Sequence, residues 1–448
     1  MNTKLDDATP LADQDPSITT ALPGPRAAEM IASRREFLSP SLIHVFPLMV
    51  QRASGCMVED VDGNVFLDCE AGIATASTGH CHPKVVEAVK AQSEVLIHMC
   101  GTDFHYPGYG ELCRRLAQYA PGPDDWRTYL SNSGTESVEA AIKLARHHTG
   151  RSDIIAFRGA FHGRSLGSLS LTASKTKYRR RFGPLLPGVH HVTYANPSQR
   201  NHAAQQTPEA YGIACVEEGI ERDLFQYTVP PDQVAAIVVE PVQGEGGYIV
   251  PPRSFLERLR RLCDEHGILL VFDEVQAGMG RTGTFFAAEH FGVMPDIITL
   301  AKGLATGFPL GAMMARPDVM TWPGGTHGST CAGNPVCIAA ALATLDLLES
   351  ELCQNSREVG TYLQDKLRQE VGGLSTVVEV RGLGLMIGIE MTSPELAEEI
   401  LQRCYRRGLL ILDCGEQALR MAPPLILTRH QADIAVDIFA AVCRECSA

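Results

Sequence analysis

Two charged residues, Asp273 and Lys302, each stand at the end of a short apolar run. Residues 268–272 lead into Asp273, and residues 297–301 lead into Lys302. Aliphatic runs of this length between turn residues are typical of strands buried on both faces of a parallel sheet. Ligands of open α/β sheets bind beyond the carboxyl ends of such strands, where both side chains would lie. A carboxylate and an amine there suit pyridoxal phosphate, which needs a lysine Schiff base and a carboxylate for its pyridinium nitrogen; two solvated charges are the alternative.

A segment of small residues, Ser-Asn-Ser-Gly-Thr-Glu at positions 131–136, follows another predicted strand and opens a helix. Backbone amides can converge there on a phosphate, an anion that a helix N-terminus favours. Gly134 and Thr135 are the best-placed donors. The segment lacks the Gly-Lys-Ser/Thr ending of a nucleotide-binding loop, so it predicts a phosphate without predicting a nucleotide. An ordinary Ser/Thr helix cap is the alternative.

Further strand ends and loops carry aromatic or polar side chains. Phe161 follows the next strand, where its ring can stack on a planar heterocycle or simply join the core. Glu240 ends a buried strand, and Glu245 lies in the Gly-rich turn after it. The loop at 330–335 offers a hydroxyl, and solvated turns are the alternative for both segments. Arg420 is a lone cation in an apolar strand, so we expect a carboxylate of the protein or of a substrate opposite it.

Composition excludes several classes of protein. The 448 residues, 45% hydrophobic and 20% charged, suit a soluble globular chain with room for more than one domain. The net charge of −13 argues against a nucleic-acid-binding surface. His-Cys-His at positions 80–82 has no second ligand cluster after it, so no metal site is expected. No apolar run reaches about 18 residues and no signal peptide is evident, which favours a cytoplasmic protein without a membrane span.

Strand and helix patterns alternate between residues 128 and 315, which predicts an α/β domain with a mostly parallel seven-stranded sheet. The turn pair Asp62-Gly63 predicts a hairpin across residues 50–67. The strands predicted for the sheet are 128–130, 153–157, 190–194, 235–240, 268–272, 297–300 and 311–315, and the intervening helices include 136–147, 214–226 and 252–266.

The last hundred residues or so differ in pattern and predict a smaller α+β domain. Strands are expected at 377–391 and 409–412, with two helices between Asn334 and about residue 370. The first 24 residues are polar and aperiodic, which favours a mobile or partner-bound arm. We therefore expect an N-terminal arm and short helix (1–45), an N-terminal part of the small domain (46–77), a large cofactor-binding domain (78–336) and a C-terminal small domain (337–448).

In combination and in order, these motifs resemble those of the class III aminotransferases, which belong to the fold type I pyridoxal-phosphate enzymes. The resemblance covers roughly residues 40–445. The motifs are Asn-Ser-Gly-Thr-Glu at 132–136, Phe-His-Gly-Arg at 161–164, Glu-Pro-Val-Gln-Gly-Glu-Gly-Gly at 240–247, Asp-Glu-Val-Gln at 273–276, Ala-Lys-Gly at 301–303, Gly-Ser-Thr at 328–330, Gly-Asn-Pro at 333–335 and Leu-Arg-Met-Ala-Pro-Pro at 419–424.

The resemblance implies a role for each motif around the cofactor. Lys302 would be the Schiff-base lysine and Asp273 the partner of the pyridinium nitrogen. The other roles fall to Gly134 and Thr135 (phosphate), Phe161 (one ring face, with His162 beside it), Val275 (the other face), Gln276 (the phenolic oxygen) and Glu240 (support near Asp273 and Gln276).

The substrate side is also implied by the resemblance. Thr330 would reach the phosphate of the neighbouring subunit's cofactor, which implies a homodimer with shared active sites. Arg420 would bind a substrate carboxylate, and Glu245 would pair with Arg420 when that carboxylate is absent. Ile73 would line the substrate pocket.

Gly-Thr-Asp-Phe at 101–104 and Tyr-Ile-Val-Pro-Pro at 248–252 most resemble the 4-aminobutyrate aminotransferase branch, which includes ornithine aminotransferases and amino-acid racemases. The resemblance implies amino transfer from a 4-aminobutyrate- or ornithine-like ω-amino acid to 2-oxoglutarate through the Lys302 Schiff base. Cys331 and Ala332 differ from the residues common at these positions of the family motif and leave the substrate specificity open. A racemase or epimerase on the same scaffold is the first alternative. A non-catalytic cofactor-binding regulator is the second, and the intact Asp273 and Lys302 argue against it.

Overall fold

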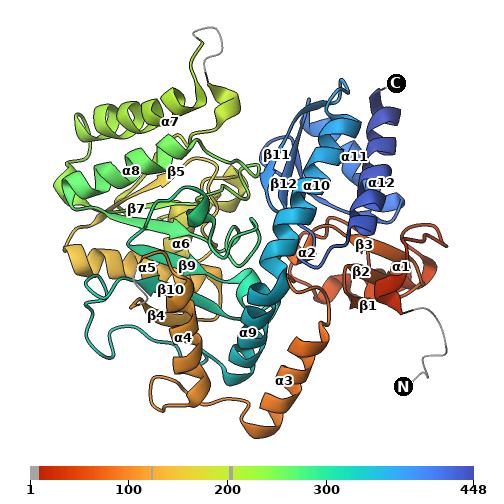
Figure 1. Cartoon of the computed structure of the whole chain (residues 1–448), viewed down its shortest axis with the longest axis horizontal. Coiled ribbons are helices and arrows are strands. Elements are labelled where there is room, and N and C mark those ends of the chain that lie inside the picture. Colours follow the sequence, from red (N-terminus) through yellow and green to blue (C-terminus); the bar gives the residue numbers. More distant parts are fainter. Residues whose placement is uncertain (1–9, 123–124, 201–204, 448) are drawn as a thin grey trace.

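The computed structural model describes residues 10–122, 125–200 and 205–447. Figure 1 shows a central sheet covered by helices, with a second group of helices and small sheets beside it. The first strands of the chain, in red, lie next to the last helices, in blue. Within the described ranges, no helix is long and apolar enough to cross a membrane.

The central sheet has seven strands in the order β4-β10-β9-β8-β7-β5-β6. The neighbours from β9 to β6 pair in parallel, whereas β10 runs antiparallel to both β9 and β4. The prediction of a mostly parallel seven-stranded sheet is therefore confirmed. The strands are β4 (Arg127–Ser131), β5 (Asp153–Phe157), β6 (Val189–Val192), β7 (Val234–Val239), β8 (Leu269–Asp273), β9 (Ile297–Leu300) and β10 (Gly311–Ala315).

Helices cover both faces of this sheet because successive strand side chains point to opposite sides. On β7, Ile237 and Val239 belong to the cluster that contains Leu259 of α8, whereas Val238 belongs to the cluster that contains Leu144 of α5. Burying such a side chain stabilises the fold by roughly 1.5–3 kcal/mol. The helices of this part are α3 (Pro83–Val95), α4 (Pro107–Tyr119), α5 (Gly134–Thr149), α6 (Leu166–Leu171), α7 (Pro208–Val216) and α8 (Arg253–His266).

The helix predicted over 214–226 begins earlier than expected. Thr207 caps it by accepting a hydrogen bond from the Ala210 N–H, and Pro208 occupies its first turn. It continues as a π-helical segment, η5 (Glu217–Phe225). The remaining short 3₁₀ turns are η1 (Leu11–Asp13), η2 (Arg35–Phe37), η3 (Thr176–Tyr178), η4 (Pro197–Gln199), η6 (Pro231–Gln233), η7 (Ala287–His290) and η8 (Lys302–Leu304).

The predicted hairpin forms at the N-terminal side, where β2 (Met57–Asp60) and β3 (Val65–Asp68) pair antiparallel across a turn that contains Gly63. Strand β1 (Val50–Ser54) flanks it, and helix α1 (Pro25–Arg34) precedes it. The expectation of a mobile arm is wrong for residues 10–24, and the partner-bound alternative stays a prediction. Ser17 exchanges backbone hydrogen bonds with Val65, and the Asn64 amide oxygen accepts the N–H groups that follow in the arm. Residues 1–9 lie outside the described residues.

The C-terminal part forms an antiparallel sheet in the order β11-β12-β15-β14. The single strand expected over 377–391 is instead a hairpin, because Gly384 turns the chain with a φ of +55°. The strand expected over 409–412 is split, and its first half, β13 (Leu409–Leu410), pairs in parallel with β3. The elements are β11 (Val377–Leu383), β12 (Met386–Met391), α11 (Pro394–Arg406), β14 (Leu412–Cys414), β15 (Ala418–Met421) and α12 (Arg429–Ser447).

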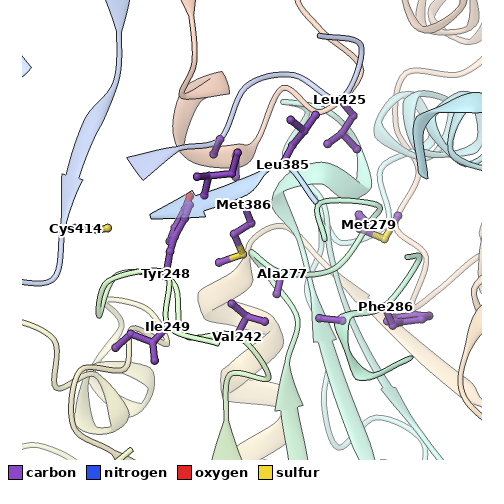
Figure 2. Close-up of a cluster of buried hydrophobic side chains, with 14 of the residues drawn as sticks. Val242, Tyr248, Ile249, Ala277, Met279, Phe286, Leu385, Met386, Cys414 and Leu425 are labelled. Carbon is purple, nitrogen blue, oxygen red and sulfur yellow. The ribbon is translucent and has the colours of Figure 1, made fainter. Parts of the chain in front are cut away.

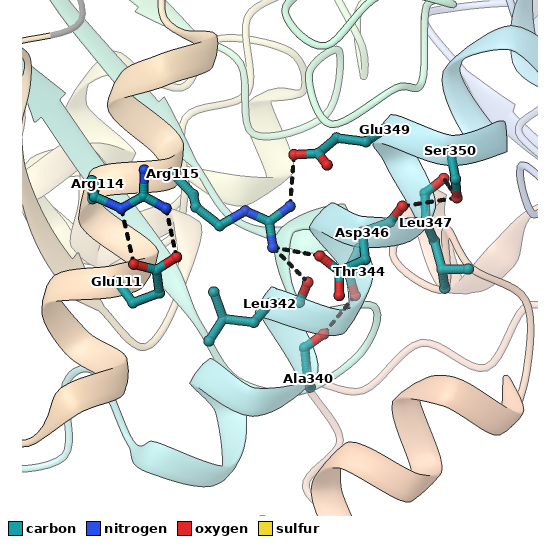
Figure 3. A network of polar contacts seen from close by, with 10 residues as sticks. All are labelled: Glu111, Arg114, Arg115, Ala340, Leu342, Thr344, Asp346, Leu347, Glu349 and Ser350. Carbon is teal, nitrogen blue, oxygen red and sulfur yellow. Dashed lines mark hydrogen bonds and ion pairs between the residues drawn. The ribbon is translucent and has the colours of Figure 1, made fainter.

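One continuous helical run connects the two parts: α9 (Pro335–Leu347), the π-helical η9 (Leu348–Leu352) and α10 (Cys353–Val371). Asn334 caps its start by accepting two backbone N–H groups. Figure 3 shows how Arg115 of α4 holds it: its guanidinium donates to Asp346 at 2.5 Å and to Glu349 at 2.7 Å. The two predicted helices are therefore joined, and the expected domain boundary at 336/337 falls at the start of this run. The division into domains stays a prediction.

Apolar packing also joins the turn after β7 to the C-terminal part, as Figure 2 shows. Tyr248 and Met386 are fully buried and lie in the same apolar cluster. The turn after β7 contributes Val242 and Ile249 to this cluster, and the C-terminal hairpin contributes Leu385. The base of the turn that carries Glu245 is thereby fixed against the C-terminal sheet.

Candidate active site

A cavity of about 420 Å³ opens at the carboxyl ends of the central strands. Its walls are the loops that follow β4, β5, β7, β8 and β9. It brings together most of the residues singled out from the sequence: Gly134, Thr135, Phe161, His162, Glu240, Asp273, Val275, Gln276 and Lys302. In the described chain, Ile73, Glu245, Thr330 and Arg420 are not among the lining residues.

Lys302 lies directly after β9, where the chain turns into η8 with a φ of +38°. This left-handed conformation costs a non-glycine residue roughly 1–2 kcal/mol, and such strain accumulates at functional sites. Burial lowers the pKa of the Lys302 amine to about 8, although the nearby Asp273 carboxylate opposes the shift. At pH 7 about a tenth of an amine with this pKa is free of its proton and can accept one, far more than for an ordinary lysine.

Asp273 is the last residue of β8 and is held by two donors. His162 Nδ1 donates to Asp273 Oδ2 at 2.7 Å, and the Val275 N–H donates to Asp273 Oδ1 at 3.0 Å. Burial alone would lower the pKa of His162, but its hydrogen bond to Asp273 raises that pKa above the usual value. A protonated His162 stabilises a negative charge on Asp273. The arrangement therefore presents the Asp273 carboxyl group to the cavity in a position fixed by two hydrogen bonds.

Glu240 closes the end of β7 and accepts hydrogen bonds from the backbone of two loops. The Phe161 N–H donates to Glu240 Oε2 at 3.2 Å, and the Gly244 N–H donates to Glu240 Oε1 at 3.1 Å. Burial raises the pKa of Glu240 to about 7. Its contacts position the aromatic residue on one side of the cavity and the start of the Gly-rich turn on the other.

The first turn of α5 lies at the cavity, and its role in binding a phosphate stays a prediction. Ser133 caps the helix, and the next two residues, Gly134 and Thr135, face the cavity. A Cβ atom at Gly134 would lie 2.8 Å from Val275 Cγ1, so glycine permits the helix end to approach that loop. The Thr135 hydroxyl contacts the Ser165 hydroxyl at 2.8 Å. Backbone N–H groups and hydroxyls at a helix N-terminus suit a phosphate.

Two buried polar atoms at the cavity show what kind of ligand fits. Gln276 Oε1 and His162 Nε2 are buried and have no hydrogen-bond partner among the described residues. Both side chains line the cavity, and buried polar atoms are normally hydrogen-bonded. A planar molecule with polar edge groups and a phosphate would satisfy the donor and acceptor set present. The described residues hold no cluster of His, Cys, Asp or Glu placed to bind a metal ion.

Arg420 lies on β15, and the carboxylate expected opposite it is that of Glu245. Its Nη1 atom is 3.1 Å from Glu245 Oε2, and its guanidinium carbon lies 5.9 Å from the centre of the Tyr248 ring. Arg420 is 4% exposed. Burial alone would lower the pKa of Arg420, but Tyr248, Cys414 and Glu245 raise it. The residue therefore remains a cation at all physiological pH values.

Two predicted residues lie on the outside of this chain. Thr330 is exposed, although the neighbouring Ser329 hydroxyl accepts a hydrogen bond from the Asn132 amide at 3.2 Å, at the rim of the cavity. Ile73 is 42% exposed and lies in a left-handed turn, α2 (Ala71–Ala74), with a φ of +62°. Thr75, directly after this turn, does line the cavity.

The sequence reasoning gave no role to Arg164, Tyr178 or Lys175. Arg164 lines the cavity, and its guanidinium carbon lies 4.8 Å from the centre of the Tyr178 ring. Tyr178 and Lys175 contact Glu245. Arg164 ends the Phe-His-Gly-Arg motif, so a cation next to the predicted stacking ring was the available signal. The other two lie in an aperiodic loop that gave none.

The fold and the cavity together define a pyridoxal-phosphate enzyme of fold type I. Lys302, the Asp273 carboxyl group and the N-terminus of helix α5 lie together at the carboxyl edge of one mostly parallel sheet. The family described as "Aminotransferase class-III" matches residues 39–443. The chain therefore belongs to the class III aminotransferases and is a pyridoxal-phosphate-dependent transaminase.

Relatives of different activity resemble the chain over nearly its whole length. An alanine/serine racemase of Pyrococcus horikoshii is 39% identical over 435 residues, which cover 94% of this chain and 91% of that protein. The 4-aminobutyrate aminotransferase GabT of Escherichia coli is 41% identical over 417 residues, which cover 90% of this chain and 95% of that protein. A solved amine transaminase from an uncultivated Pseudomonas species, in a pyridoxal-phosphate-bound form, superposes with a TM-score of 0.83 at 32% identity, covering 92% of this chain and 99% of that one.

Proposed function

We propose that this transaminase moves the amino group of an ω-amino acid, 4-aminobutyrate- or ornithine-like, to 2-oxoglutarate. One observation carries the proposal: Arg420 and Glu245 form a shielded ion pair at 3.1 Å beside the Lys302 loop. A pocket that accepts both an ω-amino acid and an α-oxo dicarboxylate needs a cation that is neutralised for one substrate and available for the other. A reversible ion pair within the protein meets that need.

The cavity residues would hold pyridoxal phosphate as follows. Gly134 and Thr135 would bind the phosphate, and Asp273 would pair with the ring nitrogen. Phe161 and Val275 would contact the two ring faces. Gln276 Oε1, which has no hydrogen-bond partner among the described residues, would accept a hydrogen bond from the phenolic hydroxyl, and this supports the placement. The bound cofactor supplies an electron sink for the bonds that break at the substrate carbon.

Lys302 would carry protons during the reaction. With a pKa of about 8, its amine would accept a proton from a substrate carbon held beside it and later donate that proton again. His162 would support this step indirectly, because its hydrogen bond holds the Asp273 carboxyl group in place. Helix α5 would hold the phosphate end of the cofactor. The proton that Lys302 carries would then move only between two fixed positions.

Two cations would sort the carboxylates of the substrates. Arg164 lines the cavity and would take the carboxylate distant from the reacting carbon. Arg420 would stay with Glu245 while an ω-amino acid is bound and would turn to the second carboxylate of 2-oxoglutarate. Bidentate guanidinium–carboxylate pairs favour this kind of recognition. The role of Ile73 in the pocket stays a prediction.

We also propose that the active form is a homodimer with Thr330 reaching the neighbouring site. Large apolar side chains are exposed on the N-terminal segments: Phe37, Leu42, Ile43, Val95, Ile97, Met99 and Phe104. Contiguous exposed apolar surface favours association. Thr330 is exposed on a loop beside the cavity rim, as a residue that serves a partner must be.

A racemase on the same scaffold is the second candidate, favoured by the 39% identity to the alanine/serine racemase. A racemase would use the same lysine and return the proton to the opposite face of the α-carbon. A single-enantiomer amino acid incubated without any oxo acid distinguishes the two activities. Sustained loss of optical rotation without oxo-acid formation supports racemisation.

A donor panel tests the proposed transamination. The purified holoenzyme is incubated with 2-oxoglutarate and, in turn, 4-aminobutyrate, ornithine, N-acetylornithine and alanine, and glutamate is quantified. We expect the ω-amino donors to give the fastest glutamate formation. Lys302→Ala should fold but form none. If no donor yields glutamate with the wild type, the proposed function fails.

A further inference from the structure

The two oxygens of the Glu245 carboxylate contact different groups, one Arg420 and the other Tyr178 and Lys175. Glu245 Oε2 contacts Arg420 Nη1 at 3.1 Å. Glu245 Oε1 accepts a hydrogen bond from the Tyr178 hydroxyl at 3.2 Å and lies 3.7 Å from Lys175 Nζ. The three contacts coexist, so Lys175 and Tyr178 do not compete with Arg420 for the same oxygen.

Lys175 is anchored independently of Glu245. Its amine donates to Asp413 Oδ2 on β14 at 2.9 Å. Burial alone would lower the pKa of Lys175, but Asp413 and Glu245 raise it above the usual value, so the amine stays charged. Asp413 therefore holds the cation in place independently of Glu245.

Tyr178 connects this anchor to the cofactor cavity. Its ring meets the Phe161 ring edge to face, with centroids 5.7 Å apart and an interplanar angle of 80°. The Arg164 guanidinium also lies over the Tyr178 ring, with its carbon 4.8 Å from the ring centre. Edge-to-face aromatic and cation–π contacts both restrict ring position. The hydroxyl is thus aimed at Glu245 from a fixed ring.

We propose that Lys175 and Tyr178 are positioning residues that hold Glu245 after Arg420 has turned to a substrate carboxylate. The inference rests on the proposed function and identifies what lowers the free-energy cost of opening the Glu245–Arg420 pair. Releasing Arg420 would otherwise leave a shielded carboxylate without a counter-ion, which is strongly unfavourable. With the second anchor present, Glu245 loses one ion pair and keeps another. Because Arg420 already neutralises Glu245 in the closed pair, Lys175 and Tyr178 stabilise Glu245 more strongly once that pair has opened, and this difference favours dicarboxylate binding.

The variants Lys175→Met and Tyr178→Phe test this inference. We expect Lys175→Met to raise KM for 2-oxoglutarate about tenfold, equivalent to about 1.4 kcal/mol, and Tyr178→Phe to raise it by a smaller factor. KM for 4-aminobutyrate should stay within about twofold, because Arg420 remains paired in that half-reaction. Lys175→Arg keeps the charge and should restore most of the affinity. Lys366→Met, which removes a lysine that pairs with Asp433 elsewhere on the surface, is the matched control.

A double-mutant cycle separates this role from a merely structural one. When Glu245→Gln removes the charge that needs an anchor, adding Lys175→Met should no longer change KM for 2-oxoglutarate. Calorimetric titration of the same holoenzymes with glutarate, an unreactive dicarboxylate, and with valerate, a monocarboxylate, gives a readout without turnover. The Kd of glutarate should rise in Lys175→Met, and that of valerate should not.

The two proposals fail in different ways. A wild type that forms no glutamate from any donor defeats the proposed function, while the glutarate titration still reports on the anchor. Unchanged glutarate binding in Lys175→Met overturns the anchor. Equal losses for glutarate and valerate, or an undiminished Lys175→Met effect in the Glu245→Gln background, overturn it as well.

Discussion

Replacing Lys302 by methionine should stabilise the cofactor-free protein at neutral pH. The amine is buried, and burial lowers its pKa from the ordinary 10.5 to about 8. A shift of this size corresponds to about 3 kcal/mol of unfavourable energy in the folded state when the amine is protonated. Methionine has a similar length and no charge, so it removes this cost.

The pH dependence carries the test, because packing of the methionine adds an offset that does not vary with pH. Between pH 8 and 10.5 the unfolded lysine still holds a proton that the folded lysine has lost, so wild-type stability rises with pH in this window. The variant lacks this contribution. Its advantage over the wild type should therefore shrink from about 3 kcal/mol at pH 6.5 to about 1 kcal/mol at pH 9.5.

Urea unfolding of both cofactor-free proteins, at one protein concentration and several pH values, measures the difference. Other groups that titrate in this range are shared by the two proteins and cancel. A difference that stays constant from pH 6.5 to 9.5 would show that the Lys302 pKa is not depressed and would refute the reasoning. A difference that grows with pH would refute it equally.

Three further predictions concern other parts of the molecule. Glu245→Gln leaves Arg420 without its internal partner, so the preference for 4-aminobutyrate over α-amino donors, measured as a ratio of kcat/KM values, should fall by about tenfold; an unchanged ratio would contradict the switch. Thr330→Val should lose cofactor on dialysis, and mixing it with Lys302→Ala under conditions of subunit exchange should restore activity, because one mixed site then has both intact residues; without recovery, Thr330 does not serve the neighbouring site. Arg115→Met should lower the free energy of unfolding by about 1 kcal/mol, since this arginine is largely shielded but its partners are exposed. Chemical denaturation that shows no loss would mean that the network in Figure 3 does not contribute to stability.

The central strands could be predicted because their residues form short, uniformly apolar runs. Strand β5 (Asp153–Phe157) was predicted with its observed bounds, and β9 (Ile297–Leu300) likewise. Their order in space could not be read in the same way. Strand β10 lies between β4 and β9 and runs against both, although its continuous apolar run looks like those of the parallel strands, so its direction could not be predicted.

The cofactor side of the site was more predictable than the substrate side. Residues such as Asp273 and Lys302 stand at strand ends, so the parallel sheet alone brings them to one edge. Glu245 and Arg420 are 175 positions apart, and only packing of the C-terminal sheet on the turn after β7 brings them together. The left-handed turn at Ile73 depends equally on tertiary contacts, because only one of its four residues is glycine.

Transfer of a labelled amino group tests the central claim most directly. The holoenzyme is incubated with ¹⁵N-labelled 4-aminobutyrate, or with δ-¹⁵N-labelled ornithine, and unlabelled 2-oxoglutarate, and the glutamate is analysed by mass spectrometry. The account predicts ¹⁵N-glutamate in step with consumption of one of these donors, and none from Lys302→Ala. Absence of labelled glutamate with both donors, together with racemisation of alanine or serine in the absence of oxo acid, would contradict it.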